Sequence, residues 1–154
     1  MLPNYEITVD SNCVIESIHE FNFSVNRLYT AFSNAEYLQQ WWGPHGFTNT
    51  FYIFDFKPMG NWSFVMHGPN GANYQNDCQF LVIKPNEKLV WNHHSNPKFQ
   101  MNVQFVPLEE QKSKLIFGMR FLSSEQCQAL KAFILEKNEE NFQRLTPILF
   151  KIPG

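Results

Sequence analysis

The stretch Phe99-Gln-Met-Asn-Val-Gln-Phe105 alternates between apolar side chains and amides at every position. A second stretch, Leu115-Ile-Phe-Gly-Met-Arg-Phe121, places large apolar residues at the same alternate positions. Successive side chains of a strand point to opposite faces of its sheet, so both stretches predict strands with one dry and one solvated face. Trp62, Phe64 and Met66 repeat the pattern. We therefore expect an antiparallel sheet that is apolar on one side.

Helical spacing is found on both sides of this strand region. From Val25 to Phe32 the large apolar residues recur at i, i+3, i+4 and i+7, and Ser24 precedes them as an N-cap. A second short helix is predicted over residues 34–41. Ser123-Ser-Glu-Gln126 has the spacing of a capping box, and helical spacing continues from there towards Pro147. This pattern predicts a long C-terminal helix near 123–145.

A sheet with one dry face needs a cover, and the C-terminal helix is the only predicted element long enough to provide it. Turn signals at regular short intervals between about 45 and 122 favour a meander of antiparallel strands. The sequence thus predicts an α+β fold, in which a curved antiparallel sheet of six or seven strands wraps around the long helix. Two short helices in the N-terminal third close one end.

Composition narrows the classes of partner. The chain has 154 residues and a formal net charge of -2, which fits a single domain over 1–154. Its twelve Lys and Arg residues are scattered and form no basic stripe, so nucleic acid is not an expected partner. The first ten residues carry no apolar run, so we expect neither a signal peptide nor membrane insertion.

The three cysteines are Cys13, Cys78 and Cys127, an odd number without CxxC spacing. This pattern fits unpaired, buried thiols better than a disulfide framework. We therefore predict three free thiols and a cytoplasmic location.

Two adjacent tryptophans, Trp41 and Trp42, precede Gly43 and Pro44. Neighbouring side chains of a helix point about 100° apart, and the glycine and proline indicate that the helix ends here. The pair therefore predicts a corner in which one ring packs in the core and the other covers the mouth of a pocket.

Residues with catalytic or metal-binding chemistry are few and lack the required spacing. The histidines are His19, His45, His67, His93 and His94. No pair has the spacing of a zinc site, so we expect no metal and no cofactor. Alternation with Trp91 turns His93 inward, where it is either a hydrogen-bonded core residue or a ligand contact. Asp55 and Asp77 have no visible base or nucleophile partner, so no catalytic residues are assigned.

Sixteen phenylalanines bring the aromatic content to 16% of the residues. Most of them are expected in an ordinary sheet core, but a surplus can line a pocket between the sheet and the long helix. The face of that helix loses its apolar character at Lys137, Asn138 and Asn141, which favours a pocket with a wet end. The candidate lining residues are Trp41, Trp42, Phe47, Trp62, Phe64, Met66, Trp91, His93, Phe105, Phe117 and Met119.

Several stretches in fixed order resemble the SRPBCC or START-like superfamily, within it the family of homologues of the activator of heat-shock protein 90 ATPase. These stretches are 19–24, 33–44, 54–71, 85–91 and 99–121, which place the family core at about 12–146. The sequence departs from the usual family pattern at Ala35, Lys57, Met59 and Asn70, of which Met59 stands where the family has a glycine. The resemblance implies a helix-grip fold with a cavity between the sheet and the long helix.

The resemblance leaves three functions open. The first is non-catalytic binding of a small hydrophobic or amphipathic ligand in an apolar cavity. The alternative is a protein-interaction domain that acts on a chaperone, as a co-chaperone-like activator of the heat-shock protein 90 ATPase in the stress response. The second alternative is a cyclase or hydratase, which needs an acid or base pointing into the cavity.

Overall fold

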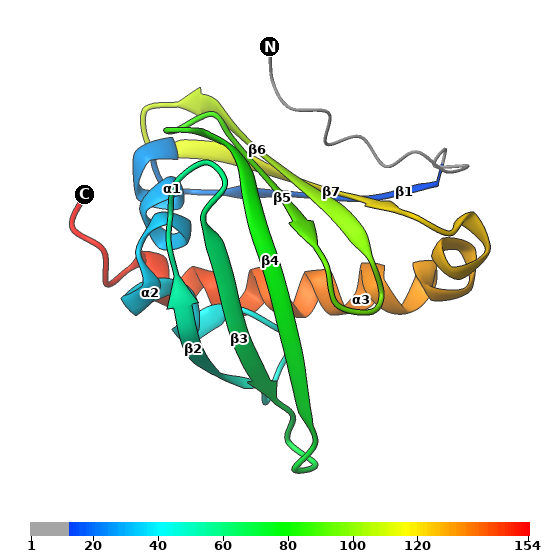
Figure 1. Ribbon diagram of the computed structural model, residues 1–154. Helices are drawn as coiled ribbons and strands as arrows, with labels where there is room; N and C mark the ends of the chain where they lie inside the picture. Colours follow the sequence, from blue (N-terminus) through cyan, green and yellow to red (C-terminus); the bar gives the residue numbers. More distant parts are fainter. Residues whose placement is uncertain (1–12) are drawn as a thin grey trace.

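Residues 13–154 are described by the computed structural model, whose centre is one antiparallel sheet of seven strands (Figure 1). The strands are β1 Val14–Phe21, β2 Thr48–Phe54, β3 Asn61–His67, β4 Asn73–Lys84, β5 Lys88–His93, β6 Phe99–Glu109 and β7 Lys112–Phe121. Their order across the sheet is β1-β7-β6-β5-β4-β3-β2, so β1 and β2 form its edges. Each consecutive pair from β2 to β7 is a hairpin, as the regular turn signals predicted.

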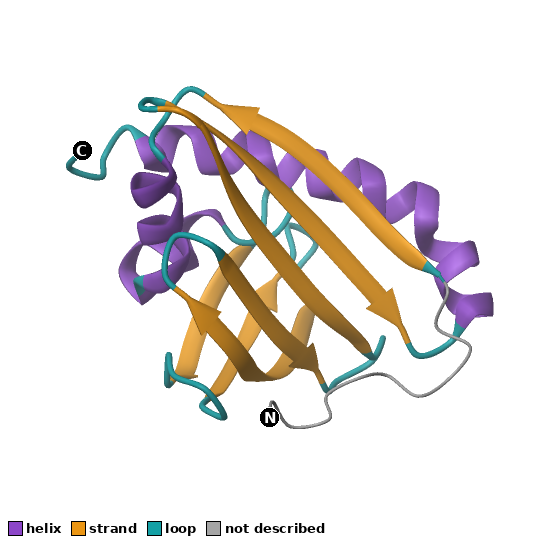
Figure 2. Cartoon of the chain, turned by 90° about the horizontal axis from the view of Figure 1, so that it is seen from above, coloured by secondary structure: helices purple, strands orange, loops and turns teal. Residues whose placement is uncertain are grey.

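Three helices accompany the sheet: α1 Val25–Ser33, α2 Ala35–Trp41 and α3 Ser124–Leu149. The side chains of Ser24, Asn34 and Ser123 each accept a backbone N–H from the first turn, so the caps predicted at Ser24 and Ser123 are present and Asn34 caps α2. The short helices lie together at one end of the sheet, and α3 runs along its concave side (Figures 1 and 2). This arrangement confirms the predicted helix-grip fold.

The long helix does not end before Pro147, as the sequence predicted; it continues to Leu149. A proline inside a helix leaves the carbonyl four residues earlier without its N–H partner. That residue is Gln143, which is exposed, so water can replace the missing donor. Ile148 and Leu149 are buried and hold the last turn against the core.

The dry face of the sheet forms the core together with α1, α2 and the second half of α3. The alternating apolar positions of β6 and β7 from Met101 to Phe105 and from Leu115 to Phe121 are buried, as predicted, whereas Phe99 is only partly buried. In α3 the buried residues after Cys127 begin only at Asn141. The first half of α3 therefore covers the sheet loosely, and the second half seals it.

The prediction of three free thiols is wrong, because Cys13 and Cys127 form a disulfide. The bond links the residue before β1 to the first turn of α3 across a sequence separation of 114 residues. An odd cysteine count does not exclude one pair, and only the fold brings two such distant residues together. Cys78 is free and buried. The cytoplasmic location was predicted partly from free thiols, and that argument no longer holds, since disulfides persist mainly in oxidising compartments.

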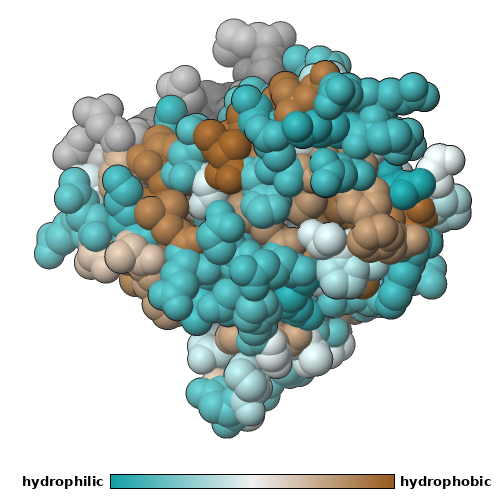
Figure 3. All heavy atoms as spheres, turned by 180° about the vertical axis from the view of Figure 1, so that it is seen from behind, coloured by the Kyte–Doolittle hydropathy of each residue, from teal (hydrophilic) through white to brown (hydrophobic). Residues whose placement is uncertain are grey.

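Within residues 13–154, no helix combines the length and the apolar composition that crossing a membrane requires. α3 is long enough, but charged and amide residues recur along it. Seen from behind, the molecule shows a mostly hydrophilic face with separate hydrophobic groups (Figure 3).

Candidate functional site

A pocket of about 420 Å³ lies between the inner face of β3, β4 and β5, the corner after α2, and the middle of α3. Its lining residues are Trp42, Pro44, Phe47, Trp62, Phe64, Met66, Tyr74, Gln75, Asn76, Cys78, Trp91, His93, Asn96, Pro97, Phe99, Phe133 and Lys137. Aromatic and other apolar side chains dominate, and the polar groups are few. A concave apolar surface of this size with a few polar groups is typical of small-molecule sites.

The paired tryptophans divide their roles at the corner. Trp41 is fully buried in the core, and its Nε1 donates to the carbonyl of Ala31 at 3.0 Å. Trp42 caps α2 in an extended conformation and turns its partly buried ring to the pocket. The next residue, Gly43, has φ +100° and lies so close to Met66 that a Cβ there would collide with its methyl group. Helix termination and close packing at Gly43 therefore fix the position of Trp42.

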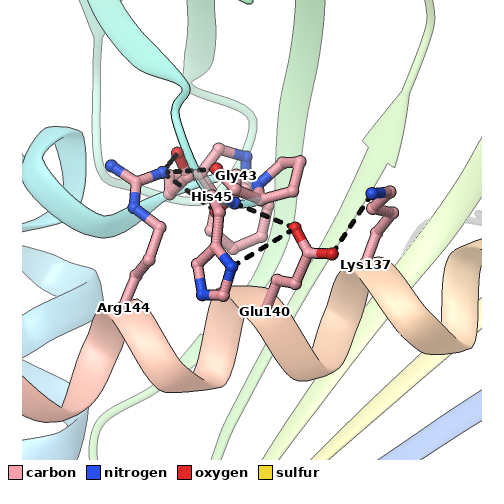
Figure 4. Close-up of polar contacts among 7 residues, drawn as sticks. Gly43, His45, Lys137, Glu140 and Arg144 are labelled. Atoms are coloured by element: carbon pink, nitrogen blue, oxygen red, sulfur yellow. Dashed lines mark hydrogen bonds and ion pairs between the residues drawn. The ribbon is translucent and has the colours of Figure 1, made fainter. Parts of the chain in front are cut away.

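A single arginine from α3 holds this corner in place. Nη1 of Arg144 donates to the carbonyls of Trp42, Gly43 and Pro44 at 3.1, 2.9 and 3.1 Å (Figure 4). Its Nη2 donates to the carbonyl of Gln40 at 2.9 Å. The carbonyls at the end of a helix have no partners within the helix, and here the guanidinium supplies them. Arg144 thus ties the end of α2 and the pocket wall to α3.

Neighbouring residues of α3 bind the backbone of the same corner. Asn141 accepts a hydrogen bond from the N–H of Gly43 at 3.2 Å, and Glu140 accepts one from the N–H of His45 at 3.1 Å. The other carboxylate oxygen of Glu140 receives Nζ of Lys137 at 3.2 Å (Figure 4). The hydrogen bond from Lys137, aided by that from His45, holds the pKa of Glu140 below its ordinary value. Glu140 therefore stays ionised between the corner and Lys137.

Aromatic rings in direct contact build the floor and one wall. Trp62 is stacked on Phe64 with centroids 4.5 Å apart. Trp42 meets Trp62 and Trp91 edge-on at 5.6 and 5.9 Å. Such tilted and offset contacts are the favoured geometries of aromatic pairs, so the wall is well packed and rigid.

His93 lies at the polar side of the pocket. Its Nδ1 lies 2.8 Å from the carbonyl oxygen of Pro97, its Nε2 lies 2.7 Å from Oδ1 of Asn76, and its ring stacks on Phe99 at 4.5 Å. Burial lowers the pKa of His93, while the hydrogen bond to Pro97 opposes this shift. Each ring nitrogen thus has an oxygen within hydrogen-bond distance, and Nδ2 of Asn76 donates to the carbonyl of Tyr74 at 3.0 Å. Both ring nitrogens are therefore engaged within the protein.

Cys78 lines the pocket and pairs with His93 across β4 and β5. Burial, and to a smaller extent the charge of Asp77, raises the pKa of the Cys78 thiol far above its ordinary value. The thiolate is the nucleophilic form of cysteine, so this side chain behaves as a small apolar wall residue at neutral pH.

Seven of the eleven candidate lining residues lie around the pocket: Trp42, Phe47, Trp62, Phe64, Met66, Trp91 and His93. The other four, Trp41, Phe105, Phe117 and Met119, are absent from its lining and buried in the core. Phe105 packs edge-on against Phe32 of α1 at 5.2 Å, and Phe117 contacts Phe142 of α3 at 4.8 Å. Alternation identified their face of the sheet but not which part of that face the helices cover.

Sequence reasoning missed the lining residues of β4, which are Tyr74, Gln75, Asn76 and Cys78, as well as Phe99 of β6 and several residues of loops and α3. Pro44, Asn96 and Pro97 come from loops, and Phe133 and Lys137 from α3. Lys137 carried a signal, because it belongs to the position where the apolar face of the helix breaks. In residues 13–154, no cluster of three or more His, Cys, Asp or Glu side chains has the arrangement of a metal site.

The architecture, a sheet gripping one long helix with an apolar pocket between them, defines the class of helix-grip proteins. The chain belongs to the family described as Activator of Hsp90 ATPase homolog 1-like protein, whose model matches residues 22–149. No curated protein matches the chain.

Solved structures share this fold at low sequence identity. A protein of Nitrosomonas europaea is 17% identical, with a TM-score of 0.82 over 93% of this chain and 97% of that one. A protein of Arthrobacter aurescens is 22% identical, with a TM-score of 0.81 over 97% and 90%. The AHSA1 protein of Silicibacter pomeroyi is 22% identical, with a TM-score of 0.73 over 89% and 97%. These likenesses extend to the fold alone.

Proposed function

We propose that this protein binds a small hydrophobic or amphipathic molecule in the pocket and does not transform it. The observation that carries the proposal is a pocket of about 420 Å³ whose walls are mainly aromatic. Pockets of roughly 300–1,000 Å³ with apolar walls and few polar groups accommodate small organic ligands. The clamp of Arg144 and Asn141 on the corner supports it further, since a preformed site loses less entropy on binding.

A co-chaperone-like role is the second candidate, and the family description favours it. An interaction domain needs exposed apolar anchors. The outer face of β1 offers two, Val14 at 39% and Ile18 at 49% exposure. The sites differ in position, because these anchors lie on the face opposite to the pocket. A chaperone partner therefore predicts that Ile18→Asp abolishes complex formation and leaves the pocket intact.

The cyclase or hydratase alternative needs an acid or base that reaches the ligand. His93 is the candidate, but both of its nitrogens bind protein groups. The proposal includes neither nucleic acid nor membrane insertion as partners, and the cytoplasm remains the predicted location.

Titration with an apolar fluorescent dye tests the binding proposal. We expect saturable binding with 1:1 stoichiometry and quenching of tryptophan emission, because three of the four tryptophans line the pocket. Phe64→Trp fills the pocket from its wall and should abolish binding while the fold stays intact. Met119→Trp is the matched control, because Met119 is buried outside the lining. Overpacking at this core position should lower the free energy of unfolding by about 1–3 kcal/mol without filling the pocket. Absence of saturable binding to the unaltered protein would contradict the proposal.

A further inference from the structure

The charge of the pocket wall is unbalanced. Among the residues that line it, all within the described part of the chain, Lys137 is the only one with a formal charge at neutral pH, and none is Asp or Glu. His93 is the other basic side chain, and burial lowers its pKa and favours the neutral ring. A ligand in this pocket therefore meets one positive charge in the wall, that of Lys137, whose ion-pair partner Glu140 lies outside the lining.

The lysine is held at the edge of the pocket by two contacts. Its Nζ donates to Glu140 Oε2 at 3.2 Å and lies 5.4 Å from the centroid of the Phe133 ring. Phe133 and Lys137 are four residues apart and thus occupy one face of α3. These two contacts within α3 define the position of the ammonium group before any ligand arrives.

Lys137 retains capacity to bind an anion. An ammonium group has three N–H donors, and Glu140 takes one of them. Glu140 cannot follow a ligand into the pocket, because its other oxygen accepts the backbone N–H of His45 on the corner. The side chain of Lys137 is about one-third exposed, at 34%, so an anion bound to it keeps contact with water. Such a pair avoids the desolvation penalty of a fully buried ion pair.

The other polar part of the lining, formed by Asn76 and His93, offers no comparable site for an anion. Asn76 and His93 bind each other, and Pro97 binds the remaining ring nitrogen. An anion placed there would have to break a hydrogen bond that the protein already makes. The apolar part of a ligand fits between these two polar regions, against Trp42 and Phe64.

We propose that the ligand is an amphipathic carboxylate, with its carboxylate on Nζ of Lys137 at the pocket edge and its apolar chain among the aromatic rings. This inference rests on the proposed function and names the class of ligand for the same pocket. A charge-assisted hydrogen bond at a partly exposed site favours the carboxylate over its neutral analogue by about 5- to 10-fold in affinity.

Three probes of equal chain length separate the charge from the apolar contribution: decanoate, decanol and decylammonium, titrated at pH 7.5. We expect decanoate to bind about 5- to 10-fold more tightly than decanol, and decylammonium to bind more weakly than decanol. Lys137→Met should reduce the affinity for decanoate to that for decanol, and Lys137→Arg should keep the preference. Lys131→Met, which removes an exposed lysine of α3 outside the pocket lining, should change nothing.

The outcomes distinguish the two proposals. If none of the three probes binds to the unaltered protein, the proposed function fails and the inference fails with it. If all three bind equally, or if Lys137→Met keeps the preference for decanoate, the pocket still binds amphipathic molecules but the assignment of the carboxylate to Lys137 is overturned.

Discussion

Removing the Cys13–Cys127 disulfide should destabilise the protein substantially. The bond closes a loop with a sequence separation of 114 residues. In the chain-entropy model, closing a loop of roughly 100 residues restricts the unfolded chain by about 4.7 kcal/mol, and measured effects are typically about 2–4 kcal/mol. We expect the lower range, because the first half of α3, which the bond anchors, contributes only one buried residue, Cys127.

The measurement is urea unfolding followed by circular dichroism, with and without dithiothreitol. Reduction should lower the free energy of unfolding by about 2–4 kcal/mol. Cys13→Ala/Cys127→Ala should have the lowered stability without reductant and should not respond to dithiothreitol. Cys78→Ala is the matched control, because it removes the free thiol and keeps the bond.

Thiol titration in denaturant provides the independent check. Without reductant, one thiol should react, that of Cys78, and after reduction all three cysteines should react. Three reactive thiols in protein never exposed to reductant would refute the pairing. Unchanged stability on reduction, with the pairing intact beforehand, would refute the argument from loop closure.

Five further variants test the corner, two turns and the buried histidine. Arg144→Met removes the donor to four backbone carbonyls, so it should lower the free energy of unfolding in urea by about 2–4 kcal/mol and weaken dye binding. Arg144→Lys should restore only part of the stability and part of the binding. Met59 has φ +69°, so Met59→Gly should stabilise by roughly 0.5 kcal/mol, and Asn86→Gly, at φ +64°, should gain less because asparagine tolerates this region. Burial lowers the folded-state pKa of His93, so its contribution to the free energy of unfolding should be constant above the unfolded pKa of about 6.5 and should fall as the pH drops below it. In urea unfolding between pH 7.5 and 5, the midpoint of the His93→Gln variant should lack this decrease.

The fold was predictable because local patterns and global packing agree in this chain. Alternation over Phe99–Phe105 and Leu115–Phe121 identified strands whose apolar side chains, except the partly buried Phe99, are buried. The caps Ser24 and Ser123 were visible in the sequence. The end of α3 was predicted too early, since a proline usually stops a helix. Tertiary burial of Ile148 and Leu149 outweighed that local preference.

The site was less predictable because its boundary depends on which part of the sheet the helices cover. Phe64 and Phe117 have the same sequence signature, an apolar residue in an alternating strand, yet one lines the pocket and the other packs under Phe142. Distinguishing them requires the position of α3 relative to each strand. The disulfide posed the same difficulty, since its two cysteines are brought together only by the pairing of β1 with β7 and the start of α3.

The three polar residues that interrupt the apolar face of α3, Lys137, Asn138 and Asn141, have different roles in the structure. Asn138 donates to Ser17 of β1 at 3.0 Å, and Asn141 binds the N–H of Gly43, so both amides satisfy groups within the fold. Only Lys137 lies in the pocket lining. The two amides fasten the helix to β1 and to the corner after α2, and these attachments fix the position of α3 relative to the sheet. The same polar residues that interrupt the apolar face therefore border the pocket and place its single charged lining residue, Lys137, at the pocket edge.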